Sequence, residues 1–482
     1  MSSAPKNRTS FTSPLAGRYG ASEMSGIFSE QFKFSTWRKL WIALAEAESD
    51  LGLPITQKQI DQLKAAVDTV NFEDAEAKEK EIRHDVMSHV YAYGLQAPDA
   101  KGIIHLGATS AYVADNTDLI QIRTGLRVIA KKLVNVIAAL AAFAEKHRAL
   151  PTLAYTHFQP AQPTTVGKRA CLWIQDLLLD LEEIELVEKN LPFLGVKGTT
   201  GTQASFLELF EGDVSKVHAL EAAVAKKLDF ERILAVSGQT YTRKLDYRAL
   251  SALSGVAQSA HKFANDLRLL AHLKQMEEPF ETGQVGSSAM AYKRNPMRAE
   301  RMTGMARHVI TLTLDPALTA AEQWFERTLD DSSNKRLAVP EAFLTLDIVL
   351  ETWLNVAQNL VVYPAVIAAQ LAAEMPFMMS ENIMMEAVKL GGDRQELHEQ
   401  IRVHSQAAAA QVKQFGKPND LLERIATDPS FDNVKNKISE IADPARYVGM
   451  SVEQTDRFLK DEVKPILDAR KSLLGLTGQV SV

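Results

Sequence analysis

The sequence predicts an all-α protein built around a bundle of long helices. Apolar residues recur at helical spacing over long stretches, and strand-like alternation is scarce. The composition, 46% hydrophobic and 24% charged residues, is that of an ordered globular chain. With 482 residues the chain is long enough for about three domains and for a large core without disulfide or metal staples.

The elements follow in order along the chain. Before about residue 110, shorter helical segments alternate with loops. Apolar stripes with steps of three and four residues then predict long helices over residues 124–147, 170–184, 250–270 and 343–360. The last stripe stops before Pro364, and the rest of the chain is more polar and is broken by Gly391-Gly392 and Gly416-Lys417-Pro418. We predict an N-terminal helical domain over 1–110, a central bundle over 111–364 and a C-terminal helical domain over 365–482.

The charge and cysteine content indicate which classes of partner and which cellular compartment to expect. The chain has 54 basic and 60 acidic residues, a net charge of −6, which argues against a nucleic-acid surface. Its one cysteine, Cys171, forms no intrachain disulfide and suits a reducing compartment. No stretch approaches the ~20 apolar residues of a membrane span. Met1 to Ser10 lacks a signal core, and Gly478 to Val482 carries no lipidation signal. We expect a cytoplasmic protein with no membrane or nucleic-acid partner.

Several common catalytic motifs are absent. The chain has no Gly-x-Gly-x-x-Gly, no Walker-type Gly-x4-Gly-Lys-Ser/Thr, no Gly-x-Ser-x-Gly and no His-Glu-x-x-His. His84 and His89 are five residues apart, so they cannot chelate one metal from a single helix face. We therefore expect neither a metal nor a cofactor.

Two Gly- and Ser-rich segments interrupt the helical pattern, residues 195–205 and residues 281–296. We call the second the 281–296 loop. At its end, Asn295 is predicted to cap a helix that starts at Pro296 and continues to Ile310. The free N–H groups of such a helix start bind anions, and Lys293, Arg294 and Arg301 stand beside it. The alternative is an ordinary helix cap with a solvated basic cluster.

Other candidates are a second basic cluster and two histidines. Residues 327–336 contain Arg327 and Arg336, which could grip phosphate oxygens, or could form a solvated loop with local Asp–Arg pairs. His157 lies in a polar loop between two long helices, and His84 lies beside Asp85. Either histidine could be an acid or base or have a structural role.

The motifs resemble those of the fumarase/aspartase superfamily. Gly286-Ser-Ser-Ala-Met-Ala-Tyr-Lys-Arg-Asn-Pro-Met297 is similar to its signature loop, and Thr156-His157 and Gly107-Ala-Thr-Ser110 are similar to its other shared regions. Arg83-His84-Asp85 and the segment Lys197 to Ser205 resemble the eukaryotic branch of the adenylosuccinate lyase family. One departure is Ala291, where the superfamily loop usually has proline.

The resemblance implies a cofactor-free elimination of fumarate from adenylosuccinate, giving AMP, and from the succinylated aminoimidazole carboxamide ribotide. It implies that Ser287 is the general base and His157 the general acid. Lys293 would stabilise the carbanion and Glu300 would orient the catalytic histidine. The implied substrate contacts are Arg18, Tyr19, Arg83, His84, Asp85, Thr109, Ser110, Thr156, Gln239, Ser288, Asn295, Arg301, Arg327, Ser332 and Arg336.

The resemblance also implies a three-domain fold whose central bundle forms the core of a homotetramer, with active sites shared between subunits. Two alternatives stay open. One is another lyase of the superfamily, such as argininosuccinate lyase or fumarase. The other is a catalytically inactive helical scaffold, against which the presence of Ser287, His157, Lys293 and Glu300 argues.

Overall fold

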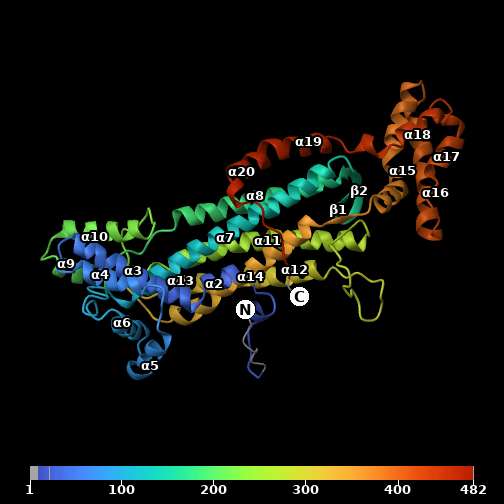
Figure 1. Cartoon of the computed structure of the whole chain (residues 1–482). Coiled ribbons are helices and arrows are strands. Elements are labelled where there is room, and N and C mark those ends of the chain that lie inside the picture. Colours follow the sequence, from blue (N-terminus) through green and yellow to red (C-terminus); the bar gives the residue numbers. More distant parts are fainter. Residues whose placement is uncertain (1–8, 21, 481–482) are drawn as a thin grey trace.

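The computed structural model describes residues 9–20 and 22–480. The predicted features at Met1 to Arg8 and at Ser481 and Val482 lie outside these residues. Figure 1 shows an elongated molecule in which long helices run side by side, with smaller helices gathered at both ends. Apart from two small two-stranded sheets, the regular elements of the described chain are helices, so the all-α prediction is confirmed.

The N-terminal part folds into short helices packed around one longer one. The helices are α1 (Pro14–Gly17), α2 (Ser22–Ile27), α3 (Glu30–Asp50), α4 (Gln57–Ala65), α5 (Phe72–Ile82) and α6 (Asp85–Gln96). Helix α3 carries Trp37 and Trp41, which are almost fully buried. Trp41 donates its indole N–H to His105 Nδ1 at 2.9 Å, which ties α3 to the segment before the bundle.

The bundle contains the long helices that the apolar stripes predicted. Its helices are α7 (Ser110–Lys146), α8 (Val166–Asn190), α11 (Lys244–His272), α12 (Met297–Leu312), α13 (Leu314–Glu322) and α14 (Asp331–Gln358), with α9 (Ala204–Leu209) and α10 (Val214–Lys227) at one end. Trp173, Phe263 and Trp353 from three of these helices pack ring against ring in the core, with centroids 5.0 and 5.1 Å apart. The stripes are therefore the buried faces that hold the bundle together.

A β-hairpin replaces the loop that was expected between the first two long helices. Strands β1 (Pro151–Thr156) and β2 (Gln159–Thr165) pair antiparallel, and Thr156 lies opposite Gln159. The turn is therefore His157-Phe158, and both residues have positive φ, 53° and 56°. A second small sheet joins β3 (Met276–Glu277) to β4 (Val361–Val362).

The C-terminal part gathers beyond the hairpin and then returns along the bundle (Figure 1). Its helices are α15 (Pro364–Lys389), α16 (Arg394–Phe415), α17 (Leu421–Thr427), α18 (Ile438–Ile441), α19 (Ser451–Phe458) and α20 (Lys464–Ala469). Short turns of 3-10 helix, η1 (Pro429–Phe431), η2 (Lys435–Lys437), η3 (Pro444–Tyr447) and η5 (Lys471–Leu473), and one π turn, η4 (Leu459–Val463), connect them. No helix of the described residues has the length and apolar character to cross a membrane. The proposed division into three domains stays a prediction.

Candidate active site

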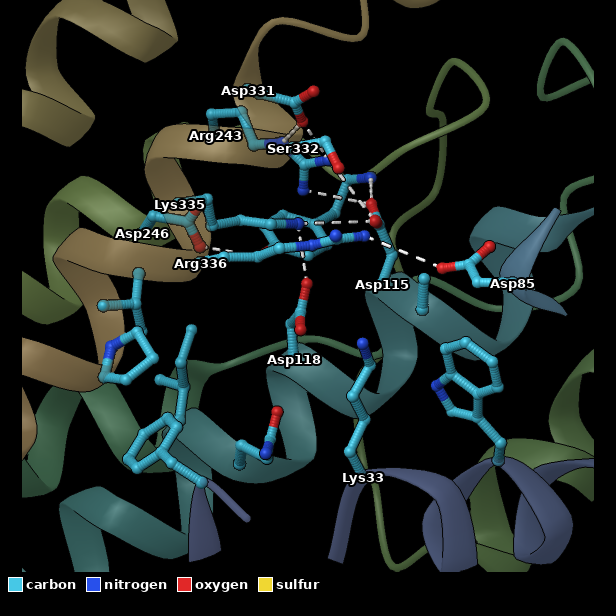
Figure 2. Close-up of a pocket in the computed structure, with 18 of the residues that line it drawn as sticks. Lys33, Asp85, Asp115, Asp118, Arg243, Asp246, Asp331, Ser332, Lys335 and Arg336 are labelled. Atoms are coloured by element: carbon cyan, nitrogen blue, oxygen red, sulfur yellow. Dashed lines mark hydrogen bonds and ion pairs between the residues drawn. The ribbon is translucent and has the colours of Figure 1, made fainter. Parts of the chain in front are cut away.

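A cavity of about 330 Å³ opens where α3, α6, α7 and the start of α14 meet. Figure 2 shows it lined by charged side chains from all four helices. Four residues predicted from the sequence line it: Asp85, Arg327, Ser332 and Arg336. We call it the α14 cavity.

His84, Asp85 and Ser110 form one wall of this region. His84 caps α6, because its Nδ1 accepts the N–H of Met87 at 3.3 Å. With Nδ1 accepting, the neutral ring carries its proton on Nε2, which lies 3.5 Å from Ser110 Oγ. Arg336 Nη2 lies 3.7 Å from Asp85 Oδ2. Next to these, Arg83 ends α5 in a left-handed conformation and Thr109 precedes α7.

The floor of the α14 cavity is a buried network of paired charges. Arg243, 2% exposed, donates from Nε to Asp331 Oδ2 at 2.6 Å and from Nη1 to Asp115 Oδ2 at 3.1 Å. Lys335 Nζ lies 2.6 Å from Asp118 Oδ2. Burial alone would raise the pKa of Asp115, but the charges of Lys335 and Arg243 outweigh it and lower the pKa. These cations are therefore already neutralised by carboxylates.

Lys33, which also lines the cavity, is not paired in this way. It makes no hydrogen bond or ion pair with any described residue, and its ammonium packs 5.1 Å from the ring centroids of Phe34 and Trp37. Burial lowers the pKa of Lys33, although the charge of Asp118 acts to raise it. The sequence analysis missed Lys33. The available signal was its place one helical turn before Trp37, on the buried face of α3.

Residues 327–336 are not the solvated loop with local Asp–Arg pairs that was one of the expectations. Helix α14 begins at Asp331, which is 1% exposed and pairs with Arg243 from the start of α11. This distant pair orients the first turn of α14, which carries Ser332 into the cavity (Figure 2).

The 281–296 loop holds Ser287 between two backbone donors. The N–H groups of Ala289 and Met290 point at Ser287 Oγ, at 3.4 and 3.1 Å. Ser288 and Lys293 are exposed. Such an arrangement stabilises negative charge on the serine oxygen, because an alkoxide is a stronger acceptor than a hydroxyl.

Two predictions about the end of this loop are wrong. Asn295 does not cap α12 and Pro296 is not its first helical residue, because the helix begins at Met297. The Asn295 side chain instead donates from Nδ2 to the carbonyl of Gly286 at 2.8 Å. It therefore ties the two limbs of the loop together. The limbs touch there, since a Cβ on Gly286 would lie 2.3 Å from the carbonyl oxygen of Lys293.

The start of α12 is also not open to an anion. The carboxylate of Glu278, 7% exposed, accepts the N–H of Arg298 at 3.0 Å and that of Ala299 at 2.9 Å. Burial raises the pKa of Glu278 despite these two hydrogen bonds. A protein carboxylate thus occupies the position that was predicted for the substrate.

The remaining predicted residues lie outside the α14 cavity. Arg301, in α12, stacks on Tyr19 with its Cζ 4.9 Å from the ring centroid, and Arg18 lies 5.6 Å from the same ring. Glu300 is exposed on the first turn of α12. Gln239 donates from Nε2 to the carbonyl of Thr199 at 2.9 Å, so the 195–205 segment supports Gln239.

His157 and Thr156 lie at the exposed turn of the hairpin, and the His157 side chain makes no hydrogen bond or ion pair with the described residues. The hairpin follows the C-terminus of α7, whereas the α14 cavity uses α7 only as far as Ile122. The helix between them spans about 35 Å at 1.5 Å per residue. Within one chain, the hairpin of β1 and β2 lies at one end of the bundle, and helices α3 and α6, which help to line the α14 cavity, lie at the other end (Figure 1).

Comparisons with known proteins agree with this architecture. A family described as "Lyase" matches residues 17–311, and one described as "Adenylosuccinate lyase C-terminus" matches residues 376–458. The chain is 52% identical to the adenylosuccinate lyase of Schizosaccharomyces pombe over 96% of this chain and 97% of that protein. It is also 52% identical to that of Saccharomyces cerevisiae, over 95% of each chain, and 45% identical to that of Schistosoma mansoni, over 98% and 99%.

Solved structures give the same fold at low sequence identity. A fumarate lyase from Mesorhizobium sp. BNC1 superimposes with a TM-score of 0.78 at 23% identity, over 92% of this chain and 99% of that one. A 3-carboxy-cis,cis-muconate lactonizing enzyme from Pseudomonas putida gives 0.79 at 22% identity, over 95% and 99%. The fold and the lyase match define a member of the fumarase/aspartase superfamily. Within that superfamily the chain belongs to the adenylosuccinate lyase family, and it is a carbon–nitrogen lyase.

Proposed function

We propose that this enzyme splits adenylosuccinate into AMP and fumarate, and splits the succinylated aminoimidazole carboxamide ribotide in the same way. Both reactions are eliminations that break a C–N bond without water. The observation that carries the proposal is the 52% identity to yeast adenylosuccinate lyases over 95% or more of the chain. The α14 cavity, which Lys33, Arg327 and Arg336 line together with the paired cations, suits a phosphorylated substrate.

We assign Ser287 as the base that removes the proton from the carbon next to a substrate carboxylate. The backbone N–H groups that point at Ser287 Oγ, together with Lys293, would favour the ionised serine and so lower the pKa of its hydroxyl. The carbanion that forms is an aci-carboxylate with extra charge on its oxygens. Lys293 and the second N–H of the Asn295 amide are the groups that would hold this charge. The start of α12 does not hold this charge, because Glu278 already accepts the N–H groups of Arg298 and Ala299 there.

We assign His157 as the acid that protonates the departing nitrogen. Its position at an exposed turn, with no hydrogen bond or ion pair to residues 9–20 or 22–480, suits a group that completes a site on another subunit. A carboxylate next to a histidine stabilises the protonated ring. Glu300 is the residue proposed for that role, also across a subunit boundary.

The remaining residues are proposed to bind the anionic nucleotide. Arg327, Ser332 and Arg336 would contact the phosphate or a carboxylate in the α14 cavity. His84, Asp85 and Ser110 form the adjoining wall. The other proposed contacts are Arg18, Tyr19, Arg83, Thr109, Thr156, Gln239, Ser288 and Arg301.

We propose that the enzyme is a cytoplasmic homotetramer with active sites shared between subunits. If His157 and the α14 cavity act on one substrate, they must come from different chains, because about 35 Å of α7 separates them within one chain. Leu172, Leu179 and Leu186 form an exposed apolar stripe at seven-residue spacing along α8, which suits burial against another subunit. The single cysteine suits the cytoplasm.

The test is the ultraviolet absorbance change when purified enzyme meets adenylosuccinate, with fumarate and AMP identified as products. His157→Ala and Ser287→Ala should each lower kcat by at least ~10²-fold while the tetramer stays folded. Near-normal turnover by either variant would remove its assigned role. Release of fumarate from argininosuccinate, and none from adenylosuccinate, would favour the alternative lyase.

Lys33 is proposed as a further phosphate contact, because its ammonium reaches the α14 cavity and forms no ion pair with a carboxylate in the described part of the chain. Lys33→Gln should weaken competitive inhibition by AMP about tenfold and leave inhibition by adenosine, which lacks the phosphate, unchanged. Lys39→Gln is the matched control, since Lys39 lies on the same helix but is exposed. An equal loss of affinity for AMP and adenosine would show that Lys33 does not contact the phosphate.

A further inference from the structure

The last described residues of the chain, 475–480, lie across α14. We call them the tail strap. The N–H of Gln479 donates to Glu351 Oε1 at 2.7 Å, and the N–H of Gly478 donates to Gln358 Oε1 at 3.1 Å. Asn355 Nδ2 donates to the carbonyl of Gly478 at 3.0 Å. Because these α14 residues are spaced by four and three positions, they share one helix face.

The tail strap rests directly on the helix backbone. A Cβ on Gly478 would lie 2.2 Å from the backbone nitrogen of Asn355, so this position accepts only glycine without a shift. Helix α7 holds the other end, since Asn135 Oδ1 accepts the N–H groups of Gly475 and Leu476 at 3.0 and 2.9 Å. Both ends of a short peptide are thus fixed by side chains of the bundle.

The side chain of Asn355 is also linked to the 281–296 loop, through its oxygen and Arg298. Asn355 Oδ1 accepts Nη1 of Arg298 at 2.9 Å. Arg298 is 7% exposed on the first turn of α12, and its guanidinium also donates to the carbonyl of Pro279 at 3.3 Å and to the carboxylate of Glu281. An unbroken series of hydrogen bonds therefore runs from the chain end to the first residue of the loop.

We propose that the tail strap, acting through Asn355 and Arg298, positions the first limb of the 281–296 loop and with it Ser287. Residues 282–286 join Glu281 to Ser287. The second limb is tied to the first through Asn295 and Gly286, and Arg294 on the second limb also lies 3.7 Å from Glu277 Oε2 in β3. Fixing Glu281 therefore fixes the direction in which the loop leaves the bundle. Asn355 and Arg298 are positioning residues in this assignment, which rests on the proposed role of Ser287 as the base.

Two variants release the strap in different ways. Asn355→Leu removes the link between the tail and Arg298. Gly478→Val pushes the tail off α14 and keeps every side chain of the series. Both should raise the rate of backbone amide exchange in residues 279–290 at least ~5-fold and lower kcat at least ~5-fold, with the KM for adenylosuccinate within about twofold of wild type. Asn359→Leu is the matched control, because Asn359 directly follows α14 and its side chain donates to the carbonyl of Asn355, with no hydrogen bond to the described residues of the tail strap.

Assembly of each variant is checked by its size in solution and its melting temperature. A chain that ends at Thr477 serves where Gly478→Val does not assemble, because it lacks the same contact. Wild-type amide exchange in residues 279–290 in an assembled variant would overturn the proposal. The amide-exchange measurement needs no substrate. It therefore tests whether the tail strap orders the loop even if the enzyme does not cleave adenylosuccinate. A change in exchange with normal kcat would show that the strap holds the loop but does not position Ser287.

Discussion

Glu48 is a buried acid with no partner. Its side chain is 0% exposed in α3, and neither carboxylate oxygen accepts a hydrogen bond from the described residues. Burial raises its pKa from 4.5 to about 8. The folded protein therefore binds a proton that the unfolded chain releases above pH 4.5. Glu48 therefore contributes stability that is lost as the pH rises from about 4.5 to about 8.

Glu48→Gln removes this titration. The variant should not show the loss of stability that comes from Glu48, so its stability relative to wild type should grow by about 3–4 kcal/mol between pH 5 and pH 8. Melting temperatures of both proteins at pH 5, 7 and 8 measure the difference. Glu231→Gln, at an exposed position, is the control and should show no such trend. If the difference in melting temperature between Glu48→Gln and wild type did not change with pH, Glu48 would have an ordinary pKa in the folded protein.

Motifs in the sequence select single residues as candidates. Ser287 and His157 are proposed because their neighbours form recognisable patterns, and their roles stay predictions. Lys33 and Glu278 were not found, because the cavity that Lys33 lines and the N–H groups that Glu278 accepts are built by distant parts of the chain. Glu278 meets Arg298 and Ala299 only after β3 and the 281–296 loop have folded back. Local spacing shows that a helix needs a cap but not that a residue outside the turn supplies it.

At the scale of elements, the structure makes α12 depend on that distant cap. Glu278→Ala would leave the N–H groups of Arg298 and Ala299 buried and without acceptors, which should cost about 2 kcal/mol of stability. Glu278→Gln keeps one acceptor oxygen and should lose less. The melting temperatures of the two variants and of wild type measure the order of their stabilities. Equal melting temperatures for Glu278→Ala and wild type would show that α12 finds another cap.

The long helices were predictable as elements, and the hairpin was not. Stripes such as Leu250 to Leu270 run for many turns, so their period is unambiguous. Strands β1 and β2 are short and contain three prolines, Pro151, Pro160 and Pro163, which usually argue against a strand. A two-stranded ribbon has free edges, so these prolines interrupt no further pairing. The sequence pattern alone cannot supply that context.

At the scale of the whole molecule, the chain carries its proposed general acid and its proposed phosphate-binding residues at opposite ends of the bundle. His157 follows the C-terminus of α7, and Arg336 lines the α14 cavity near the N-terminus of α7. No motion of side chains closes a gap of about 35 Å along a rigid helix. One complete site in a single chain would need the bundle to break. The proposed tetramer instead brings the two ends together from different subunits.

Mixing two inactive variants tests this arrangement. Neither His157→Ala nor Arg336→Ala should turn over adenylosuccinate alone at more than a small fraction of the wild-type rate. After dissociation and reassembly of an equal mixture, some sites take His157 from an Arg336→Ala chain and Arg336 from a His157→Ala chain. Random assembly makes about one quarter of the sites fully wild type, so activity should return toward that fraction. If both residues of a site came from one chain, every site would keep one defect. Verified subunit exchange without any return of activity would therefore place His157 and Arg336 in sites that are not shared.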